Sequence, residues 1–194
     1  MSTFRDFLFN RDHSAAWMLA FAMTGVRMGE RALLVGDDAA LFAQLGKKVG
    51  LTGKITVVVG SQAAAARVEA GASALGVLME DIRQAGLPDV PVDKAAFDVA
   101  VFNAGPWFLA LGEGDRVSLA GGIFRALRVG GRLVVVEGQP PRFLGLLRSS
   151  QPGLEAFHAA GGAGRLLETA GFQPVRLLAD RDGQRFTEGL KTSA

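Results

Sequence analysis

The sequence has no cysteine and no tyrosine among its 194 residues, and it has only two histidines. Without cysteine the chain has no disulfide, no thiolate nucleophile and no thiolate metal site. Every apolar run is shorter than the ~18 residues that a membrane-spanning helix needs. The first residues show no signal-peptide pattern. We therefore expect a cytoplasmic protein with no membrane span.

The sequence also has no marked excess of charge of either sign. The chain carries 21 basic and 19 acidic residues, a net charge of +2. The sequence pI of about 9.4 reflects the scarcity of groups that titrate between pH 5 and 9 rather than a basic surface. Since no dense basic patch appears, we expect no nucleic-acid partner. The expected partner is a small molecule, with a homo- or hetero-oligomer left open.

Short apolar or β-branched runs alternate with longer helical patterns. This alternation predicts a parallel sheet covered by helices on both faces, which is an α/β fold with three α/β/α layers. Asp182-Gly183 joins the last two expected strands and is a strong hairpin signal, so the last strand should be antiparallel to its neighbour. The expected strands are 31–36, 54–59, 97–102, 132–137, 174–181 and 184–191, and the expected helices are 39–48, 61–75, 115–128 and 163–170.

Three segments do not fit this alternation of strands and helices clearly. Residues 76–82 fit either a third strand or a continuation of the preceding helix, because periodicity does not decide for so short a run. Residues 128–131 are expected to form a turn, and the proline-rich segment 138–153 a loop. Residues 1–28 are expected to form a helical lid in front of the α/β domain of residues 29–194.

The first expected strand is followed by few glycines. The sequence there is Val35-Gly36-Asp37-Asp38-Ala39-Ala40, with Gly36 as the one glycine. The two aspartates fit either a modified cofactor-binding or metal-binding loop, or a polar turn in which an aspartate caps the next helix. The second interpretation is favoured. A single pair of aspartates identifies no metal, because its further ligands cannot be named; we expect none.

Later segments resemble a known family, the class I S-adenosylmethionine-dependent methyltransferases, and in particular small-molecule enzymes of the ubiquinone-biosynthesis type. The resemblance covers about residues 29–191. It implies a Rossmann-like fold with a seven-stranded, mostly parallel sheet in the order 3-2-1-4-5-7-6. The segments that carry it are Ala96–Asn103, similar to the fourth strand, Leu127–Glu137, similar to the glycine turn and fifth strand, and Leu166–Phe172, similar to the last helix.

The resemblance implies a cofactor site at the carboxyl ends of the strands. Gly36 matches the first glycine of the family's loop, whereas Asp38 and Ala40 replace the next two. Asp37 and Asp38 would repel the cofactor's carboxylate or bind its ammonium group. The family's ribose-binding acid falls on Val59 or Gly60, and Ser61 or Gln62 replaces part of its function.

The adenine-binding acid of the family is matched by Asp81, which the resemblance places after the third strand. Asp81 would accept a hydrogen bond from the adenine amino group, and Ile82 would pack on the ring. Asn103 is expected to line the cofactor site from the end of its strand. Its surroundings, Asn103–Trp107, only loosely resemble the motif of amino-group methyltransferases.

Candidate acceptor-binding residues are His13, Trp17, Trp107 and Phe143. His13 and His158 are candidate general bases, although a surface or capping histidine is commoner. Trp17 and its helical neighbours fit either a pocket roof or packing against the core. No catalytic residue is assigned.

Two functions follow. The first is methyl transfer from S-adenosylmethionine to a small, largely apolar acceptor, in which alignment and exclusion of water supply the catalysis. The second is a non-catalytic, methyltransferase-like protein that has lost the cofactor and serves as a binding or partner subunit. The sequence does not decide between them, nor does it identify the acceptor.

Overall fold

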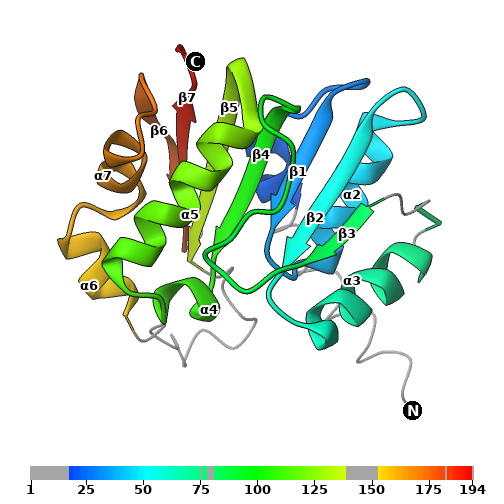
Figure 1. Cartoon of the computed structure of the whole chain (residues 1–194), viewed down its shortest axis with the longest axis horizontal. Coiled ribbons are helices and arrows are strands. Elements are labelled where there is room, and N and C mark those ends of the chain that lie inside the picture. The colour runs from blue at the N-terminus through cyan, green and yellow to red at the C-terminus, as the bar shows by residue number, and fades with distance from the viewer. Residues whose placement is uncertain (1–17, 75, 78–80, 139–152, 182, 194) are drawn as a thin grey trace.

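The computed structural model describes residues 18–74, 76–77, 81–138, 153–181 and 183–193. It shows a seven-stranded sheet between two layers of helices (Figure 1). The strand order is β3-β2-β1-β4-β5-β7-β6, and β7 runs antiparallel to both of its neighbours. This confirms the predicted fold class and strand order. The strands are β1 (Arg31–Val35), β2 (Lys54–Val59), β3 (Asp81–Gln84), β4 (Phe97–Ala104), β5 (Leu127–Gly138), β6 (Val175–Arg181) and β7 (Gln184–Leu190).

Each face of the sheet has its own apolar core. One face packs against α2 (Ala39–Val49), α3 (Gln62–Ala74) and the helical residues 18–24. The other packs against α4 (Pro106–Leu109), α5 (Glu113–Ala126), α6 (Leu154–Ala159) and α7 (Gly162–Thr169). The central strands are buried on both faces, which explains why they are continuous apolar runs without polar alternation.

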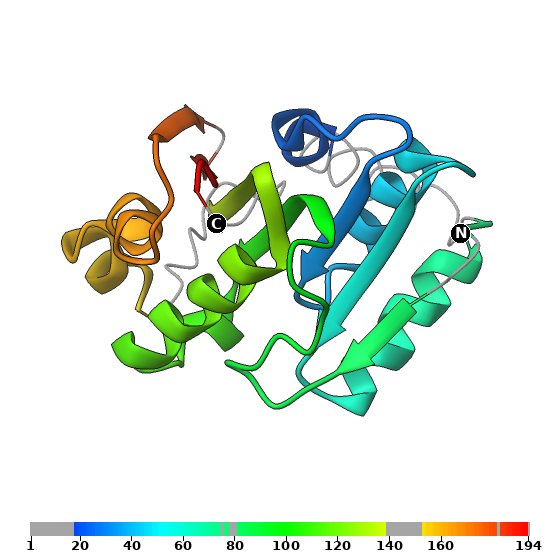
Figure 2. The ribbon, with the colours of Figure 1, turned by 45° about the horizontal axis from the view of Figure 1, so that its top comes forward.

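The described part of the expected lid lies on a face of the sheet. Residues 18–24 form the dark blue helix at the top of Figure 2. Ala20 is fully buried in the core beside α2 and α3, with Leu19, Phe21 and Met23 packed around it. The interpretation as core packing therefore holds for Phe21 and Met23, whereas Met18 is 68% exposed and does not pack in the core. Residues 1–17, which include His13 and Trp17, lie outside the described residues.

Some boundaries differ from the predictions. Helix α3 is Gln62–Ala74 and β3 is Asp81–Gln84, and residues 75 and 78–80 lie outside the described residues. The predicted turn at 128–131 lies within β5, where the pairing with β4 shifts between Phe97 and Val99 and Gly130 takes a φ of 81°. Helices α4 and α6 were not predicted, because each is at most six residues long and gives no periodic pattern. Pro106 is the first residue of α4, a position that favours proline.

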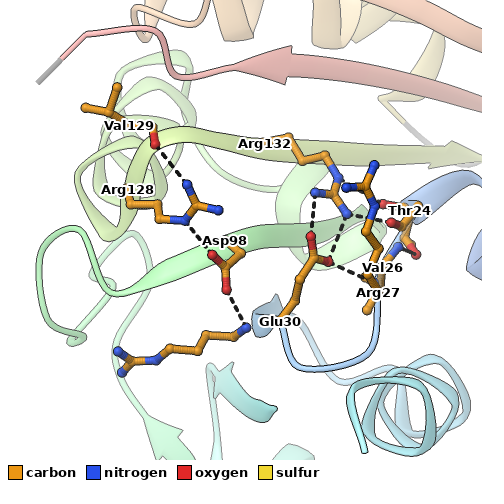
Figure 3. A network of polar contacts seen from close by, with 10 residues as sticks. Thr24, Val26, Arg27, Glu30, Asp98, Arg128, Val129 and Arg132 are labelled. Atoms are coloured by element: carbon orange, nitrogen blue, oxygen red, sulfur yellow. Dashed lines mark hydrogen bonds and ion pairs between the residues drawn. The ribbon is translucent and has the colours of Figure 1, made fainter. Parts of the chain in front are cut away.

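The amino ends of the central strands carry a network of ion pairs (Figure 3). Glu30 accepts two 3.0 Å hydrogen bonds from Arg132, whose guanidinium also donates to the carbonyls of Thr24 and Gly25. Asp98 accepts from the Arg31 amide at 2.6 Å and pairs with Arg128. This network connects the segment after residues 18–24 to β1, β4 and β5, and it fixes the opposite edge from the candidate site.

Candidate functional site

The carboxyl ends of β1, β2 and β4 surround a pocket of about 330 Å³. The register places Val35 of β1 level with Val58 of β2 and Phe102 of β4, so the residues that follow these strands meet at one edge. In open α/β sheets this edge, where the strand order reverses, is the usual ligand site. The volume lies at the lower end of the range for small-molecule sites. The lining residues are Gly36, Asp37, Gly60, Ser61, Ala64, Arg67, Leu87 and Trp107.

Two glycines keep the pocket open. Gly36 has a φ of 126°, and a Cβ there would lie 3.6 Å from the Trp107 ring. A Cβ at Gly60 would lie 3.4 Å from Leu87 Cδ1, across the pocket lining. Side chains at these two positions would therefore fill the space between β1, β2 and α4. Gly36 and Gly60 line the same pocket, and their role in cofactor binding stays a prediction.

Trp107 forms the aromatic wall of this pocket. It follows β4 in the short helix α4, and its ring makes edge contacts with Phe102 and Phe108, at centroid distances of 5.6 and 6.0 Å. Both phenylalanines are buried in the core, so the indole is held in a fixed position. Phe143, the other predicted aromatic wall, lies outside the described residues.

Asp37 and Arg67 form an ion pair at the mouth of the pocket. Arg67 comes from the second turn of α3, and more than half of its side chain is exposed. Sequence reasoning missed Arg67, because nothing in an alanine-rich helix indicates which residue faces the end of β1. A ligand that uses the Asp37 carboxylate must compete with this guanidinium.

Asp38 caps α2 rather than opening into the pocket. Its Oδ1 accepts from the Leu41 amide at 2.9 Å, which is the usual geometry of an N-cap. Its Oδ2 lies 3.5 Å from the Asn103 amide nitrogen. Burial raises the pKa of Asp38 to about 6, against the lowering effect of these hydrogen bonds. The alternative that reads Asp38 as a polar helix cap is confirmed, and Asn103 lies beside it at the end of β4.

Ser61 follows Val59 and Gly60, the two positions on which the resemblance places the ribose-binding acid. Its hydroxyl accepts from the Ala64 amide at 3.2 Å at the start of α3, and the residue also lines the pocket. Gly60 supplies no carboxylate. Among the described residues that follow β2 directly, Gly60, Ser61 and Gln62, none is an acid.

The placement of Asp81 after the third strand is wrong. Asp81 is the first residue of β3 and pairs with Thr56 in the middle of β2, away from the carboxyl edge. Its carboxylate accepts from Arg83 Nε at 2.9 Å and from the Thr56 hydroxyl at 3.3 Å. The Arg83 guanidinium lowers the pKa of Asp81. Ile82 packs into the core on the side of α3.

A second polar group lies at the same edge, at the end of β5. Glu137 is 1% exposed, and its Oε1 lies 3.0 Å from His158 Nε2 of α6 and 3.4 Å from the Ala163 amide of α7. Its Oε2 has no hydrogen-bond partner. Burial raises the pKa of Glu137, while the charges of His158 and Arg185 act against this. An unpaired buried carboxylate oxygen costs about 1–3 kcal/mol.

Glu137 was missed by the sequence reasoning, although a carboxylate at the end of the apolar run Leu133–Val136 was a visible signal. No group of three or more potential metal-ligating side chains occurs within the described ranges. In that same part of the chain, no helix is long and apolar enough to cross a membrane.

Comparison with family models and with curated proteins finds no match, whereas solved structures match over most of the chain. An S-adenosylmethionine-dependent methyltransferase from Aquifex aeolicus has a TM-score of 0.72 and 16% identity, over 90% of this chain and 89% of that one. The [4+2]-cyclase SpnF has a TM-score of 0.67 and 18% identity, over 92% and 81%. Geranyl diphosphate C-methyltransferase from Streptomyces coelicolor has a TM-score of 0.60 and 15% identity, over 92% and 79%. The chain has the fold of the class I S-adenosylmethionine-dependent methyltransferases.

Proposed function

We propose that the chain binds S-adenosylmethionine at the carboxyl ends of β1 and β2 and transfers its methyl group to a small, largely apolar acceptor. The observation that carries this proposal is the 330 Å³ pocket, which two glycines and Trp107 keep open at the point where the strand order reverses. A similar fold at these identities leaves the activity open, since one of the matching structures is a cyclase. The acceptor class comes from the resemblance to small-molecule enzymes, and one of the matching structures is a geranyl diphosphate C-methyltransferase.

The lining residues have distinct roles in this proposal. Gly36 and Gly60 let the backbone approach the adenosyl group, and Leu87 and Trp107 enclose it. The Trp107 ring also offers a face to a cation, an interaction worth about 0.5–2 kcal/mol. The bound sulfonium supplies the reactive methyl group. The protein contributes alignment and exclusion of water, so no catalytic triad is needed.

One observation favours the second function, a non-catalytic binding or partner subunit. Each acid that the resemblance assigned to the cofactor is engaged elsewhere: Asp37 pairs with Arg67, Asp38 caps α2, and Asp81 pairs with Arg83. A missing bidentate carboxylate at the ribose removes hydrogen bonds worth about 1.5–3 kcal/mol each. The cytoplasmic location and the oligomeric state remain predictions.

Calorimetric titration with S-adenosylmethionine and with S-adenosylhomocysteine tests the proposal. We expect micromolar binding of both. Gly60→Leu should weaken it at least 30-fold, because the new side chain grows into the pocket from a position without a left-handed φ. Gly60→Asp should tighten it about tenfold, if its carboxylate reaches the ribose hydroxyls.

Gly114→Leu is the matched control. Gly114 is exposed at the start of α5, and a Cβ there has no atom within 4 Å. The Gly114→Leu variant should bind S-adenosylmethionine with the same affinity as the unmodified protein. Absence of binding at millimolar ligand would reject methyl transfer by this chain alone and favour the non-catalytic alternative.

A further inference from the structure

We propose that the pocket at the carboxyl ends of β1 and β2 takes a second class of ligand, a nucleoside whose ribose carries a phosphate on its 2′ or 3′ oxygen. Arg67 and Ser61, which both line the pocket, would hold this phosphate. The inference goes beyond S-adenosylmethionine binding and does not depend on it. It rests on the charge and the hydrogen-bonding groups that the pocket presents beside the end of β2.

The residues that follow the second strand decide what such a pocket accepts from a ribose. In dinucleotide-binding α/β folds, an acid there accepts hydrogen bonds from the free ribose hydroxyls, whereas a nearby arginine accommodates a phosphate on the same sugar. Here the described residues directly after β2 include no acid, and Arg67 places a guanidinium at the pocket. This combination favours the phosphorylated sugar over the free one.

The hydroxyl and the guanidinium come from the same helix. The chain turns at the lower end of β2 in Figure 1 and returns as α3. Ala64 and Arg67 are three residues apart on one face of α3, and both line the pocket. Ser61 Oγ accepts from the Ala64 amide at 3.2 Å, and a hydroxyl that accepts in this way can also donate to a phosphate oxygen. One rigid element therefore presents both groups to the ligand.

Asp37 is the present partner of Arg67, and a phosphate can replace it. The two side chains are 58% and 41% exposed, and such exposed pairs are weak because water solvates both charges well. A phosphate monoester carries nearly two negative charges and three acceptor oxygens, which suit the planar fork of a guanidinium better than one carboxylate does. The bound phosphate would thus take over Arg67, and the Asp37 carboxylate would turn to the solvent.

The apolar side of the pocket suits the base of the nucleoside. Leu87 lies next to Gly60, and the Trp107 ring lies next to Gly36, so a flat ring between them would cover both glycines. The volume of about 330 Å³ is at the lower end of the range for ligand sites, which suits one nucleoside better than a dinucleotide.

Four probes test this assignment by calorimetric titration at pH 7.5: adenosine and its 2′-, 3′- and 5′-monophosphates. We expect the 2′- or the 3′-monophosphate to bind at least about tenfold more tightly than adenosine, the factor that one charge-assisted hydrogen bond supplies. The 5′-monophosphate has the same charge at another position and should show no such advantage. The ribose phosphate should also compete with S-adenosylmethionine, because both would occupy one pocket.

Substitutions show which side chains recognise the phosphate. Arg67→Gln should abolish the advantage over adenosine, and Asp37→Asn should increase it about two- to fivefold by removing the rival of the phosphate. Gly60→Asp should weaken ribose phosphate binding at least about tenfold through repulsion of like charges, although the same variant is expected to tighten S-adenosylmethionine binding. Arg165→Gln is the matched control, because Arg165 is an exposed arginine of α7, on the opposite face of the sheet.

The proposal is overturned if neither ribose phosphate binds more tightly than adenosine, or if the 5′-monophosphate binds as tightly as they do. Equal effects of Arg67→Gln and Arg165→Gln, or simultaneous binding with S-adenosylmethionine, would overturn it as well. A protein that binds the ribose phosphates and not S-adenosylmethionine would reject the proposed function and keep this inference. The reverse result would keep the proposed function and reject this inference.

Discussion

Acidic residues at the two edges of the sheet have pKa values that are shifted in opposite directions. At the amino edge, hydrogen bonds and ion pairs lower the pKa of Glu30 and of Asp98, despite some burial. At the carboxyl edge, burial raises the pKa of Asp38 and of Glu137. Ionised acids therefore stabilise the fold at one edge and destabilise it at the other. Such an uneven distribution is typical of a scaffold edge opposite a functional edge.

The difference has a local cause. Glu30 has two hydrogen bonds from one guanidinium and a third from the Arg27 amide at 2.8 Å. Glu137, by contrast, keeps one oxygen without a partner. Arginine is a strong partner for carboxylates because its planar fork donates two parallel bonds.

The largest effect is expected at the amino edge. Glu30→Ala leaves the Arg132 guanidinium, whose side chain is 16% exposed, without its carboxylate. Removing one partner of a buried pair costs 3–5 kcal/mol, and about 2–4 kcal/mol is expected for this partly buried one. Urea unfolding at pH 7.5 measures the loss in free energy of unfolding.

Asp180→Ala is the control for this experiment. Asp180 pairs with Arg185 on the surface, with side chains 50% and 37% exposed. An exposed pair contributes about 0–1 kcal/mol. Equal losses in the two variants would mean that the amino-edge network does not stabilise the fold beyond an ordinary surface contact.

Removing the charge of Asp38 is expected to stabilise the fold, by less than Glu30→Ala destabilises it. Its folded pKa of about 6 lies above the ordinary 3.8, so its stabilising contribution is complete below pH 3.8 and is lost as the pH rises through 6. Asp38→Asn keeps a good N-cap and removes the charge. We expect the variant to be about 1–2 kcal/mol more stable at pH 7.5, and no more stable at pH 4.

Urea unfolding at pH 4, 6 and 7.5 checks the pH dependence, and Asp37→Asn controls for a change of one charge at the same loop. A stability difference that stays constant across these pH values would contradict the account, because it would come from the cap and not from the ionisation.

The sequence predicted the scaffold well because the scaffold is built from apolar periodicity. The run Lys54–Val59 is β-branched and buried, and its strand has the predicted bounds. The order of the strands came from the resemblance at 96–103, 127–137 and 166–172. These segments are structural elements, so they carry information on the fold and little on ligand contacts.

The site was predicted less well because it depends on side chains that come from distant elements. Arg67 reaches Asp37 across the crossover from α3 to β1, and no local pattern records that pairing. Asp81 was predicted to follow the third strand, whereas it is the first residue of β3. A charged residue beside a short apolar run had been interpreted as the end of the strand. Glu137 and His158 meet only because α6 folds back on the end of β5.

A still smaller gain is expected for Glu137→Gln. Burial raises the pKa of Glu137, so its ionisation destabilises the folded state at pH 7.5, although the charges of His158 and Arg185 offset part of this. Removing the charge should therefore raise the free energy of unfolding at pH 7.5. Urea unfolding at pH 7.5 measures the gain, and a destabilised variant would indicate a purely structural ion pair.

The smallest effect is expected at Ser61, where two substitutions distinguish the residue's contribution to stability from its contribution to ligand binding. Ser61 both caps α3 through the Ala64 amide and lines the pocket. Ser61→Ala should cost about 0.5–1 kcal/mol, the ordinary value for a lost cap, whereas Ser61→Asp keeps the cap and should be neutral. If the ribose of the ligand lies at the end of β2, Ser61→Asp should also tighten S-adenosylhomocysteine binding in calorimetry. Unchanged binding with unchanged stability would place the ligand's hydroxyls away from β2, so that only β1 and Trp107 would hold the adenosyl group.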